Sequence, residues 1–390
     1  MKRILYFTCV VLLVSGCSTI KDKVNDLVEG GVDNADPPAP LVKFKQTVKV
    51  DTLWSTSIGA GMGDKFIKLV PHVANGKIFT ADIKGKISAH DTASGGLIWT
   101  TNLDVPVSGG PGVGEGLVLV GTSEAQVIAL DQQTGAERWR KRVSSEVLAA
   151  PTAAEGTVIA RTIDGKVIGM DAKTGRRIWV YDHKVPVLSL RGASAPVASN
   201  GIVVIGFASG KLSAFRITDG ALLWETRVAI PHGRSDLERM VDIDGDLIVS
   251  DGVIHVVTFQ GSVSTVLLQN GRVLWNREMS SHTAVANDRT NLYVTDEDGN
   301  VWALDRRSGT ALWKQDKLHA RKVTGPAVYG NLVVVGDFEG YLHWMNSRDG
   351  SFVARTKIGS KQIDQAPETV GDIVYVSSVD GTLTAVRPVK

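Results

Sequence analysis

Hydrophobic residues along the chain occur in short runs of strand length, separated by small and polar turn residues. In one representative stretch, the runs 117–121 and 126–131 and the segment 137–140 are separated by turns rich in Ser, Thr and Gly. The preceding segment 109–114, rich in Gly and Pro, supplies a fourth extended piece. Runs this short predict antiparallel β-strands rather than helices. Four such strands per repeat are typical of a propeller blade.

This stretch contains a repeated phrase, Asp-x-x-Thr/Ser-Gly, followed by a Trp four residues after the Gly. Complete copies run from Asp131 to Trp139, from Asp171 to Trp179 and from Asp305 to Trp313. Looser copies keep the spacing at Gly95/Trp99, Gly220/Trp224 and Gly271/Trp275, and a further copy has Ala354 at the Trp position. We expect the Asp to accept turn hydrogen bonds, the Gly to adopt positive φ and the Trp to pack on a neighbouring blade. Repeats of roughly 40 residues with short strands indicate a propeller or a solenoid.

The two ends of the chain predict how the ring closes. Each predicted blade has a two-residue turn before its third strand, and such turns occur eight times along the chain. Only seven of the eight third strands are followed by a fourth strand. The segment 50–56 carries Trp54 without a preceding repeat, and 383–387 is a last third strand without a fourth. We therefore predict an all-β, eight-bladed β-propeller of four-stranded antiparallel blades over residues 46–390, closed by pairing of the N- and C-terminal strands. Closure removes the two exposed sheet edges.

The residues before the propeller have the pattern of an export signal and an anchor. Residues 1–16 combine Lys2 and Arg3 with a short apolar stretch, which is typical of a signal peptide. Val14-Ser-Gly-Cys17 is similar to a bacterial lipobox, so we expect Cys17 to be acylated and Ser18 to direct the lipoprotein to the outer membrane. Residues 17–45, charged and then rich in Gly and Pro, predict a flexible tether.

Charge and composition exclude several classes of partner and chemistry. Removal of residues 1–16 leaves equal numbers of basic and acidic residues, which gives no support for binding to nucleic acid or to anionic lipid headgroups. The eight His residues are scattered, no pair of adjacent Cys occurs, and Gly-x-Ser-x-Gly is absent. Asp242-Ile-Asp244 and Asp296-Glu-Asp298 resemble calcium loops but lack the remaining EF-hand ligands. We therefore expect no catalytic residues, no cofactor and no metal.

Blade length gives the signal for a binding site. Successive Trp residues of the phrase are 40 residues apart from Trp99 to Trp179, but 45 apart from Trp179 to Trp224 and 51 from there to Trp275. The surplus falls in 185–192 and 231–244, and additional loop length on a rigid scaffold is where binding tends to occur. Each segment places Arg beside apolar residues, as interface hot spots do. Two structural alternatives stay open, in which Leu188 and Leu190 are buried strand positions and Asp242 and Asp244 are solvated turn residues.

The lipobox, the blade count and the two long segments together resemble the BamB family, propeller lipoproteins of the β-barrel assembly (BAM) machinery of Gram-negative bacteria. The runs 188–191 and 233–242 carry the most specific likeness. The resemblance implies a periplasmic, outer-membrane-anchored scaffold that is not an enzyme, binds the POTRA domains of BamA and assists barrel insertion. The contact residues that it implies are Leu188, Leu190, Arg191, Asp242 and Asp244.

In the implied mechanism the two leucines bury apolar area against a POTRA domain, and Arg191 and the aspartates add polar pairing. Exposed strand edges could also bind unfolded barrel proteins by β-augmentation, as a further hypothesis. Two other hypotheses remain: a periplasmic quinoprotein-like enzyme of the pyrroloquinoline-quinone (PQQ) type, and a polysaccharide-binding lipoprotein with an aromatic-lined channel.

Overall fold

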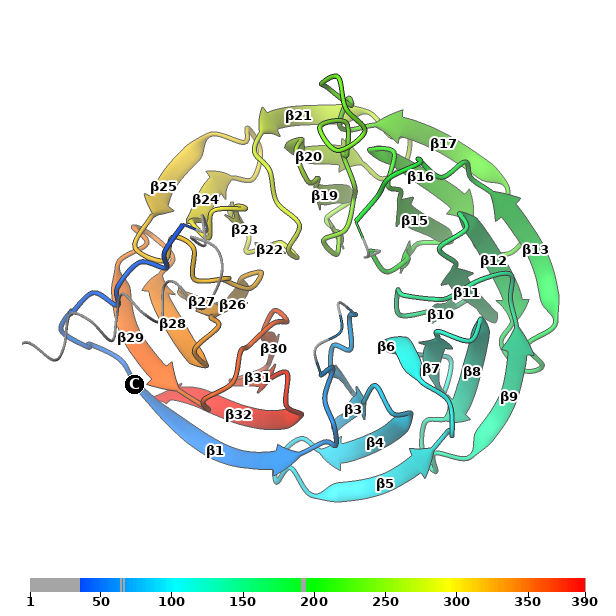
Figure 1. Ribbon diagram of the computed structural model, residues 1–390, viewed down its shortest axis with the longest axis horizontal. Coiled ribbons are helices and arrows are strands. Elements are labelled where there is room, and N and C mark those ends of the chain that lie inside the picture. The colour runs from blue at the N-terminus through cyan, green and yellow to red at the C-terminus, as the bar shows by residue number, and fades with distance from the viewer. Residues whose placement is uncertain (1–35, 64, 66, 191–193, 390) are drawn as a thin grey trace, which may run out of the picture. The chain divides into compact units, whose positions relative to one another are not determined.

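The computed structural model describes residues 36–63, 65, 67–190 and 194–389, and the predicted signal peptide, Cys17 and Arg191 lie outside these ranges. Its strands form eight separate four-stranded antiparallel sheets arranged as blades around a ring (Figure 1). Within each blade, the strands follow one another from the axis outwards. The prediction of an all-β, eight-bladed propeller is confirmed.

The first four blades follow the chain order. Their strands are β2 (His72–Ala74), β3 (Lys77–Ala81), β4 (Lys86–Asp91) and β5 (Leu97–Asn102) in blade 1; β6 (Val107–Gly114), β7 (Leu117–Thr122), β8 (Gln126–Asp131) and β9 (Glu137–Arg142) in blade 2; β10 (Thr152–Ala154), β11 (Thr157–Arg161), β12 (Lys166–Asp171) and β13 (Arg177–Asp182) in blade 3; and β14 (Val197–Ser199), β15 (Ile202–Gly206), β16 (Lys211–Arg216) and β17 (Leu222–Arg227) in blade 4.

The second half of the ring continues in the same way and then closes. Its strands are β18 (Ile248–Ser250), β19 (Val253–Val257), β20 (Ser262–Leu267) and β21 (Val273–Glu278) in blade 5; β22 (Ala286–Asn287), β23 (Asn291–Thr295), β24 (Val301–Asp305) and β25 (Ala311–Gln315) in blade 6; β26 (Ala327–Tyr329), β27 (Leu332–Gly336), β28 (Tyr341–Asn346) and β29 (Phe352–Lys357) in blade 7; and β30 (Glu368–Val370), β31 (Ile373–Ser377), β32 (Thr382–Val389) and β1 (Lys49–Ser57) in blade 8. Closure occurs as predicted, because β1 pairs antiparallel with β32 from Lys49↔Val389 to Ser57↔Thr382.

The Trp of the repeated phrase joins each blade to the next. Seven indole N–H groups donate to a backbone carbonyl of the following blade at 2.8 to 3.2 Å, and Trp139 to the Ala172 carbonyl at 2.9 Å is typical. The ring of Trp139 lies over the turn at Gly175, where a Cβ atom would come within 2.6 Å of the indole. Gly175 has φ 67°, so both the close approach and the backbone conformation require glycine. The predicted packing of the Trp on a neighbouring blade is confirmed.

The Asp of the phrase holds the same turn. The Asp131 carboxylate accepts hydrogen bonds from the backbone N–H and the hydroxyl of Thr134, both at 2.8 Å. Ala354 replaces Trp at the junction of blades 7 and 8, because the outer strand of blade 8 comes from the N-terminal part of the chain. Blade 8 therefore has no turn between its third and fourth strands on which a Trp could lie.

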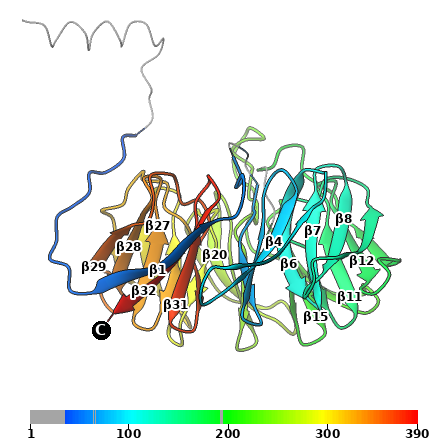
Figure 2. The same ribbon diagram turned by 90° about the horizontal axis from the view of Figure 1, so that it is seen from below.

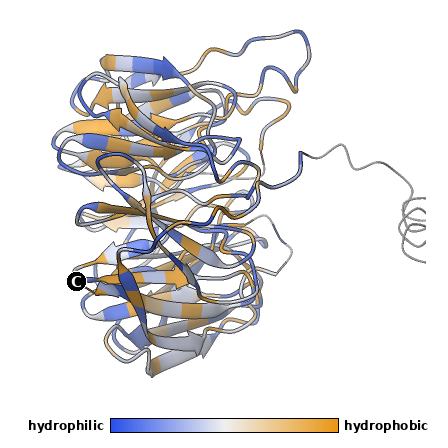
Figure 3. Cartoon of the chain, turned by 90° about the vertical axis from the view of Figure 1, so that its left-hand side faces the viewer, coloured by the Kyte–Doolittle hydropathy of each residue, from blue (hydrophilic) through white to orange (hydrophobic). Residues whose placement is uncertain are grey.

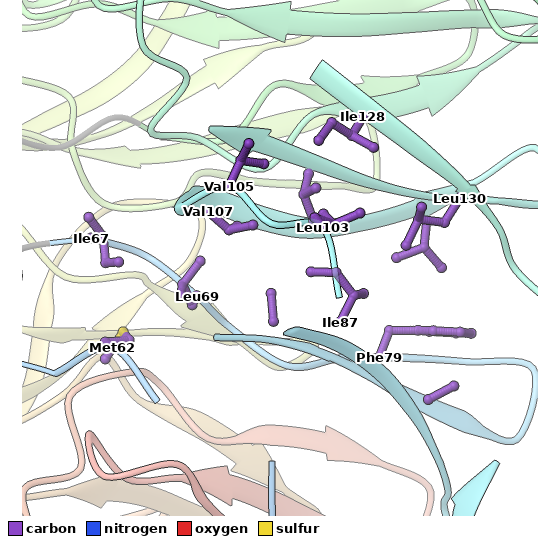
Figure 4. Close-up of a cluster of buried hydrophobic side chains, with 14 of the residues drawn as sticks. Met62, Ile67, Leu69, Phe79, Ile87, Leu103, Val105, Val107, Ile128 and Leu130 are labelled. Atoms are coloured by element: carbon purple, nitrogen blue, oxygen red, sulfur yellow. The ribbon is translucent and has the colours of Figure 1, made fainter. Parts of the chain in front are cut away.

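Apolar side chains of the middle strands fill the spaces between neighbouring blades. Between blades 1 and 2, for example, Phe79 and Ile87 pack with Ile128 and Leu130 in one buried cluster (Figure 4). The hydrophobic segments accordingly run within the strands of the blades (Figure 3). This stacked core gives the loops at either end of the blades a rigid support.

An N-terminal arm packs on blade 7, where the sequence predicted a tether. The Ala39 N–H donates to the His319 carbonyl at 2.9 Å, and the ring of Phe44 stacks on Phe352 at 5.4 Å between centroids. The arm (dark blue) runs along the side of the ring (Figure 2). The C-terminal end of the predicted tether, residues 17–45, therefore packs on the ring, because Phe44 contacts Phe352, which is more than 300 residues away in the sequence. The earlier part of the predicted tether lies outside the described residues.

Candidate docking site

One face of the propeller carries the connections between blades and the turns that join second to third strands; we call it the loop face. Exposed large hydrophobic side chains of the described residues gather there in a single sector, over blades 3 to 5. We call this set the apolar patch: Ile163, Val185, Val187, Leu188, Ile230 and Leu237. The other large hydrophobic side chains that are exposed lie on outer strands or near the opposite face. Exposed apolar side chains gathered in one sector mark a candidate interaction site.

The connection from blade 3 to blade 4, residues 183–196, presents the first part of the patch. Val187 is 94% exposed and Leu188 is 42% exposed, whereas Leu190 is only partly exposed. Two hydrogen bonds fix the backbone of this connection. The Leu190 N–H donates to the Asp242 carboxylate, and the Ala195 N–H donates to Asp246 Oδ1 at 3.0 Å. Both acceptors come from the next connection along the ring, so the two long segments found in the sequence support each other.

The second connection, residues 228–247, forms a small turn that projects from the loop face. Its Glu238 carboxylate accepts the backbone N–H groups of Arg234 and Ser235 at 2.7 and 3.0 Å. These bonds close the turn, in which Leu237 is 61% exposed; Ile230, earlier in the same connection, is 59% exposed. Figure 1 shows this projecting turn near β20 and β21.

The structure separates the roles of the residues that the sequence predicted. Leu188 lies on the surface, Leu190 lies partly below it, and Asp244 is partly buried. Asp242 is only 3% exposed and accepts the Leu190 N–H, so its carboxylate positions the connection within this chain. Burial rules out the alternative in which Asp242 is a solvated turn residue, and its contact with a partner stays a prediction. Arg191 lies outside the described residues.

Burial dominates the electrostatics beneath the connection. It raises the pKa of Asp242 from 3.8 to about 6, and the Leu190 N–H opposes this shift by stabilising the carboxylate. Asp244 lies beside a lysine. Lys68 Nζ donates a hydrogen bond to the Asp244 backbone carbonyl and lies 4.0 Å from the Asp244 carboxylate. The two aspartates therefore differ, with Asp242 bound to backbone and Asp244 bound to a lysine.

Sequence reasoning did not find Val187, Ile230 or Leu237, which are the most exposed members of the apolar patch. Their residue types alone carry no signal, because an isolated Val or Leu in a connection is as often buried as exposed. The excess length of the two connections was the only indication; it located the segments that contain Val187 and Leu237 without distinguishing these residues, and Ile230 lies just before the second segment.

A central cavity of about 620 Å³ opens beside these connections, at the axis of the ring. Its lining mixes Lys65 and Lys322 with Asp296 and Asp364, and no Trp, Tyr or Phe lines it among the described residues. Of the Trp residues outside the phrase, Trp344 is fully buried in blade 7. The polysaccharide hypothesis required an aromatic-lined channel, and the described lining of this cavity lacks one.

Within residues 36–63, 65, 67–190 and 194–389, no group of three or more His, Cys, Asp or Glu side chains is placed to hold a metal ion. Also within them, no helix has the length and apolar character needed to cross a membrane.

Comparison with known proteins places the chain among propellers of one family. A family model described as outer membrane protein assembly factor BamB matches residues 51–113, 83–315 and 303–388. The outer membrane protein assembly factor BamB of Pseudomonas aeruginosa is 50% identical over 349 residues, which cover 90% of this chain and 92% of that protein.

Solved structures agree at the level of the fold. The crystal structure of BamB from Moraxella catarrhalis aligns with a TM-score of 0.80 and 26% identity, over 87% of this chain and all of that one. A quinohemoprotein alcohol dehydrogenase from Comamonas testosteroni aligns with a TM-score of 0.70 over 87% of this chain and 76% of its own, but at 15% identity it shares the fold alone. The sequence match over nearly the whole chain decides between these neighbours: the chain belongs to the BamB family of outer membrane protein assembly factors.

Proposed function

We propose that this protein is a non-enzymatic scaffold of the outer-membrane β-barrel assembly (BAM) complex, which binds the POTRA domains of BamA and assists the folding and insertion of barrel proteins. The observation that carries the proposal is the apolar patch, confined to one sector of the loop face on a propeller of the BamB family. A rigid ring that exposes an apolar sector on its loop face is suited to hold a partner, and family membership supports the choice of partner.

Within this proposal, the residues of the docking site have different tasks. Leu188 and Val187 bury apolar area against the partner, and Leu190 anchors the connection from which they project. Asp242 fixes that connection through the Leu190 N–H, while Asp244 and Arg191 contribute polar pairing at the margin. A hydrophobic centre with a polar rim is the usual anatomy of a protein interface.

The proposed location follows from the predicted anchor. Cys17 would carry the acyl chains that hold the protein in the inner leaflet of the outer membrane, facing the periplasm. Several acyl chains anchor firmly, since each buried CH₂ contributes about 0.8 kcal/mol. Labelling with radioactive palmitate, compared between the wild-type protein and Cys17→Ser, tests the anchor; equal labelling of both would contradict it.

The docking proposal is tested by measuring the Kd of the purified full chain for the BamA POTRA domains. Leu188→Ser removes an apolar side chain from the patch, and Leu222→Ser removes one of similar exposure (45%) from the outer strand β17. We expect Leu188→Ser to raise the Kd about tenfold, as hot-spot residues do, and Leu222→Ser to leave it unchanged. Equal effects of the two substitutions would place the interface elsewhere, and no binding by the wild type would refute the proposal.

A further inference from the structure

The arm that packs on blade 7 is held by two arginine side chains that bind its backbone. Arg321 Nη1 donates to the Ala39 carbonyl at 3.0 Å, and Arg355 Nη1 donates to the Val42 carbonyl at 3.0 Å. The Arg355 guanidinium also lies over the ring of Phe44, 5.1 Å from its centroid. The position of the arm on the blade therefore depends on where these two guanidinium groups are held.

One buried carboxylate connects the two arginines. Asp337 is fully buried, and its Oδ2 atom accepts hydrogen bonds from Arg321 Nε and from the His343 imidazole, both at 2.9 Å. His343, on β28, is fully buried as well, and its Nδ1 atom accepts a hydrogen bond from Arg355 Nε at 3.2 Å. A chain of hydrogen bonds thus runs from Asp337 through the imidazole and Arg355 to the Val42 carbonyl of the arm.

These contacts require a neutral imidazole. His343 Nδ1 accepts the Arg355 N–H only while it carries no proton, so the single ring proton lies on Nε2 and is donated to Asp337. Protonation of Nδ1 would replace its hydrogen bond by two opposed N–H groups and place a positive charge against the guanidinium. Arg355 would then leave the imidazole, and its contacts with Val42 and Phe44 would be lost.

Among the described residues, the charged or titratable groups around His343 are Asp337, Arg355, Arg321 and Tyr341. Burial lowers the pKa of His343 from 6.5; the hydrogen bond to Asp337 opposes this shift, and the charges of the two arginines add to it. With the arm packed, His343 therefore binds a proton less readily than it would with the arm released. Packing of the arm is accordingly favoured above pH 6.5 and weakens as the pH falls below it.

We propose that residues 38–48 form a releasable strap and that His343 is its latch, which opens when the imidazole takes up a proton. Every residue of the strap keeps part of its surface exposed, so its release removes little buried area. The ring remains closed after release, because β1 begins at Lys49 and pairs with β32. The strap can therefore move without unfolding the propeller.

Release of the strap changes where the N-terminal chain leaves the propeller. In the packed state it leaves at the loop face, because the Ala39 N–H binds the His319 carbonyl in the connection between β25 and β26. After release it would leave at Lys49, which pairs with Val389 near the opposite face (Figure 2), and the free chain would gain roughly 35 Å of reach. For a protein anchored through its N-terminus, both changes alter how the propeller is presented. This consequence rests on the proposed anchor, whereas the latch does not.

The latch is tested by amide hydrogen exchange of the purified full chain at pH 7.5 and pH 5, expressed as protection factors to remove the intrinsic pH dependence of exchange. The reporters are the hydrogen-bonded amides of Ala39 and Thr47, near the two ends of the strap. Each pH unit below the pKa of the released imidazole shifts the equilibrium up to about tenfold. We expect protection of both amides to fall at least about tenfold at pH 5, with β28 unchanged. Equal protection at the two pH values would overturn the proposal.

Two histidine variants identify the group that titrates. His343→Gln removes the titrating ring but keeps a donor for Asp337, so protection of the strap should no longer depend on pH. His255→Gln is the matched control, because His255 is equally buried and accepts a hydrogen bond from Arg306 Nε at 2.9 Å. Arg306 binds Asp251 and not the arm, so this variant should keep the loss of protection at pH 5. A loss that persists in His343→Gln, or that disappears in His255→Gln, would overturn the proposal.

Arg355→Gln decides the matter if His343→Gln does not fold, because Arg355 is only partly buried. The substitution breaks the link between the imidazole and the Val42 carbonyl and leaves His343 free to titrate. We expect the strap amides to be less protected than in the wild type at pH 7.5, with no further loss at pH 5. A further loss as large as that of the wild type would overturn the proposal, because the arm would then respond to pH without the latch.

Discussion

Replacement of Asp242 by Asn should stabilise the protein at neutral pH, although the Asp242 carboxylate accepts a hydrogen bond from the Leu190 N–H. Asp242 is 3% exposed, and burial raises the pKa of its carboxyl from 3.8 to about 6. Folding thus favours the protonated form, so the contribution of this group to stability is complete below pH 3.8 and is lost as the pH rises through 6. A rise of the pKa from 3.8 to about 6 corresponds to roughly 3 kcal/mol. Asn carries no charge and keeps an oxygen that accepts the Leu190 N–H.

The measurement is urea unfolding, followed by tryptophan fluorescence, at pH 7.5 and at pH 4. We expect Asp242→Asn to raise the free energy of unfolding by up to about 3 kcal/mol at pH 7.5 and by less than about 1 kcal/mol at pH 4. Asp131→Asn is the control with the opposite sign, because the Arg138 guanidinium and the Thr134 hydroxyl hold the pKa of Asp131 well below its usual range. It should lose stability at both pH values. An Asp242→Asn variant less stable than the wild type at pH 7.5 would refute the reasoning.

Three further predictions concern the ring and its arm. Trp139→Ala should lower the free energy of unfolding by about 3–5 kcal/mol. Trp139→Phe loses the hydrogen bond to the Ala172 carbonyl but keeps most of the buried apolar area, so it should lower the free energy of unfolding by only about 1–2 kcal/mol. Equal losses for the two variants in urea unfolding would contradict this expectation. Phe44→Ala removes the ring that stacks on Phe352 and should release the arm, so amide hydrogen exchange in residues 39–48 should become at least about tenfold faster. Exchange in β28 should not change. Unchanged exchange in the arm would count against the packing of Phe44 on Phe352. Burial raises the pKa of Glu368 to about 7, so the stability that its protonated carboxyl contributes is present at low pH and is lost as the pH rises through 7. In unfolding measured at pH 5 and pH 8, Glu368→Gln should abolish this drop in stability between the two pH values. A drop that persists in the variant would assign the pH dependence to another group.

The fold was predictable because its determinants are local and repeated. The Asp-x-x-Thr-Gly turn closes on its own side chain, as Asp131 does, and the spacing to the Trp places each indole over the next turn. The strand 50–56, with Trp54 and no preceding repeat, predicted the closure of the ring. Even the departure at Ala354 has a topological cause, since blade 8 takes its outer strand from the other end of the chain.

The candidate docking site was only partly predictable, because its geometry depends on contacts between distant segments. The alternation of Leu188 and Leu190 is compatible with a buried strand, and only the bond from Leu190 to Asp242, 52 residues away, shows that the segment is a supported connection. That the buried Nη1 of Arg161 has no hydrogen-bond partner among the described residues likewise cannot be read from composition. The C-terminal part of the tether was mispredicted for the same reason, since Phe44 packs on Phe352.

The central claim, that the loop face over blades 3 to 5 binds BamA, is tested most directly by photocrosslinking in cells. A photoreactive p-benzoylphenylalanine is placed at Val187, which is 94% exposed in the apolar patch, or at Val370, which is 43% exposed at the end of β30 towards the opposite face. We expect a crosslink to BamA from position 187 and none from position 370. Capture of BamA from position 370 but not from position 187 would contradict it.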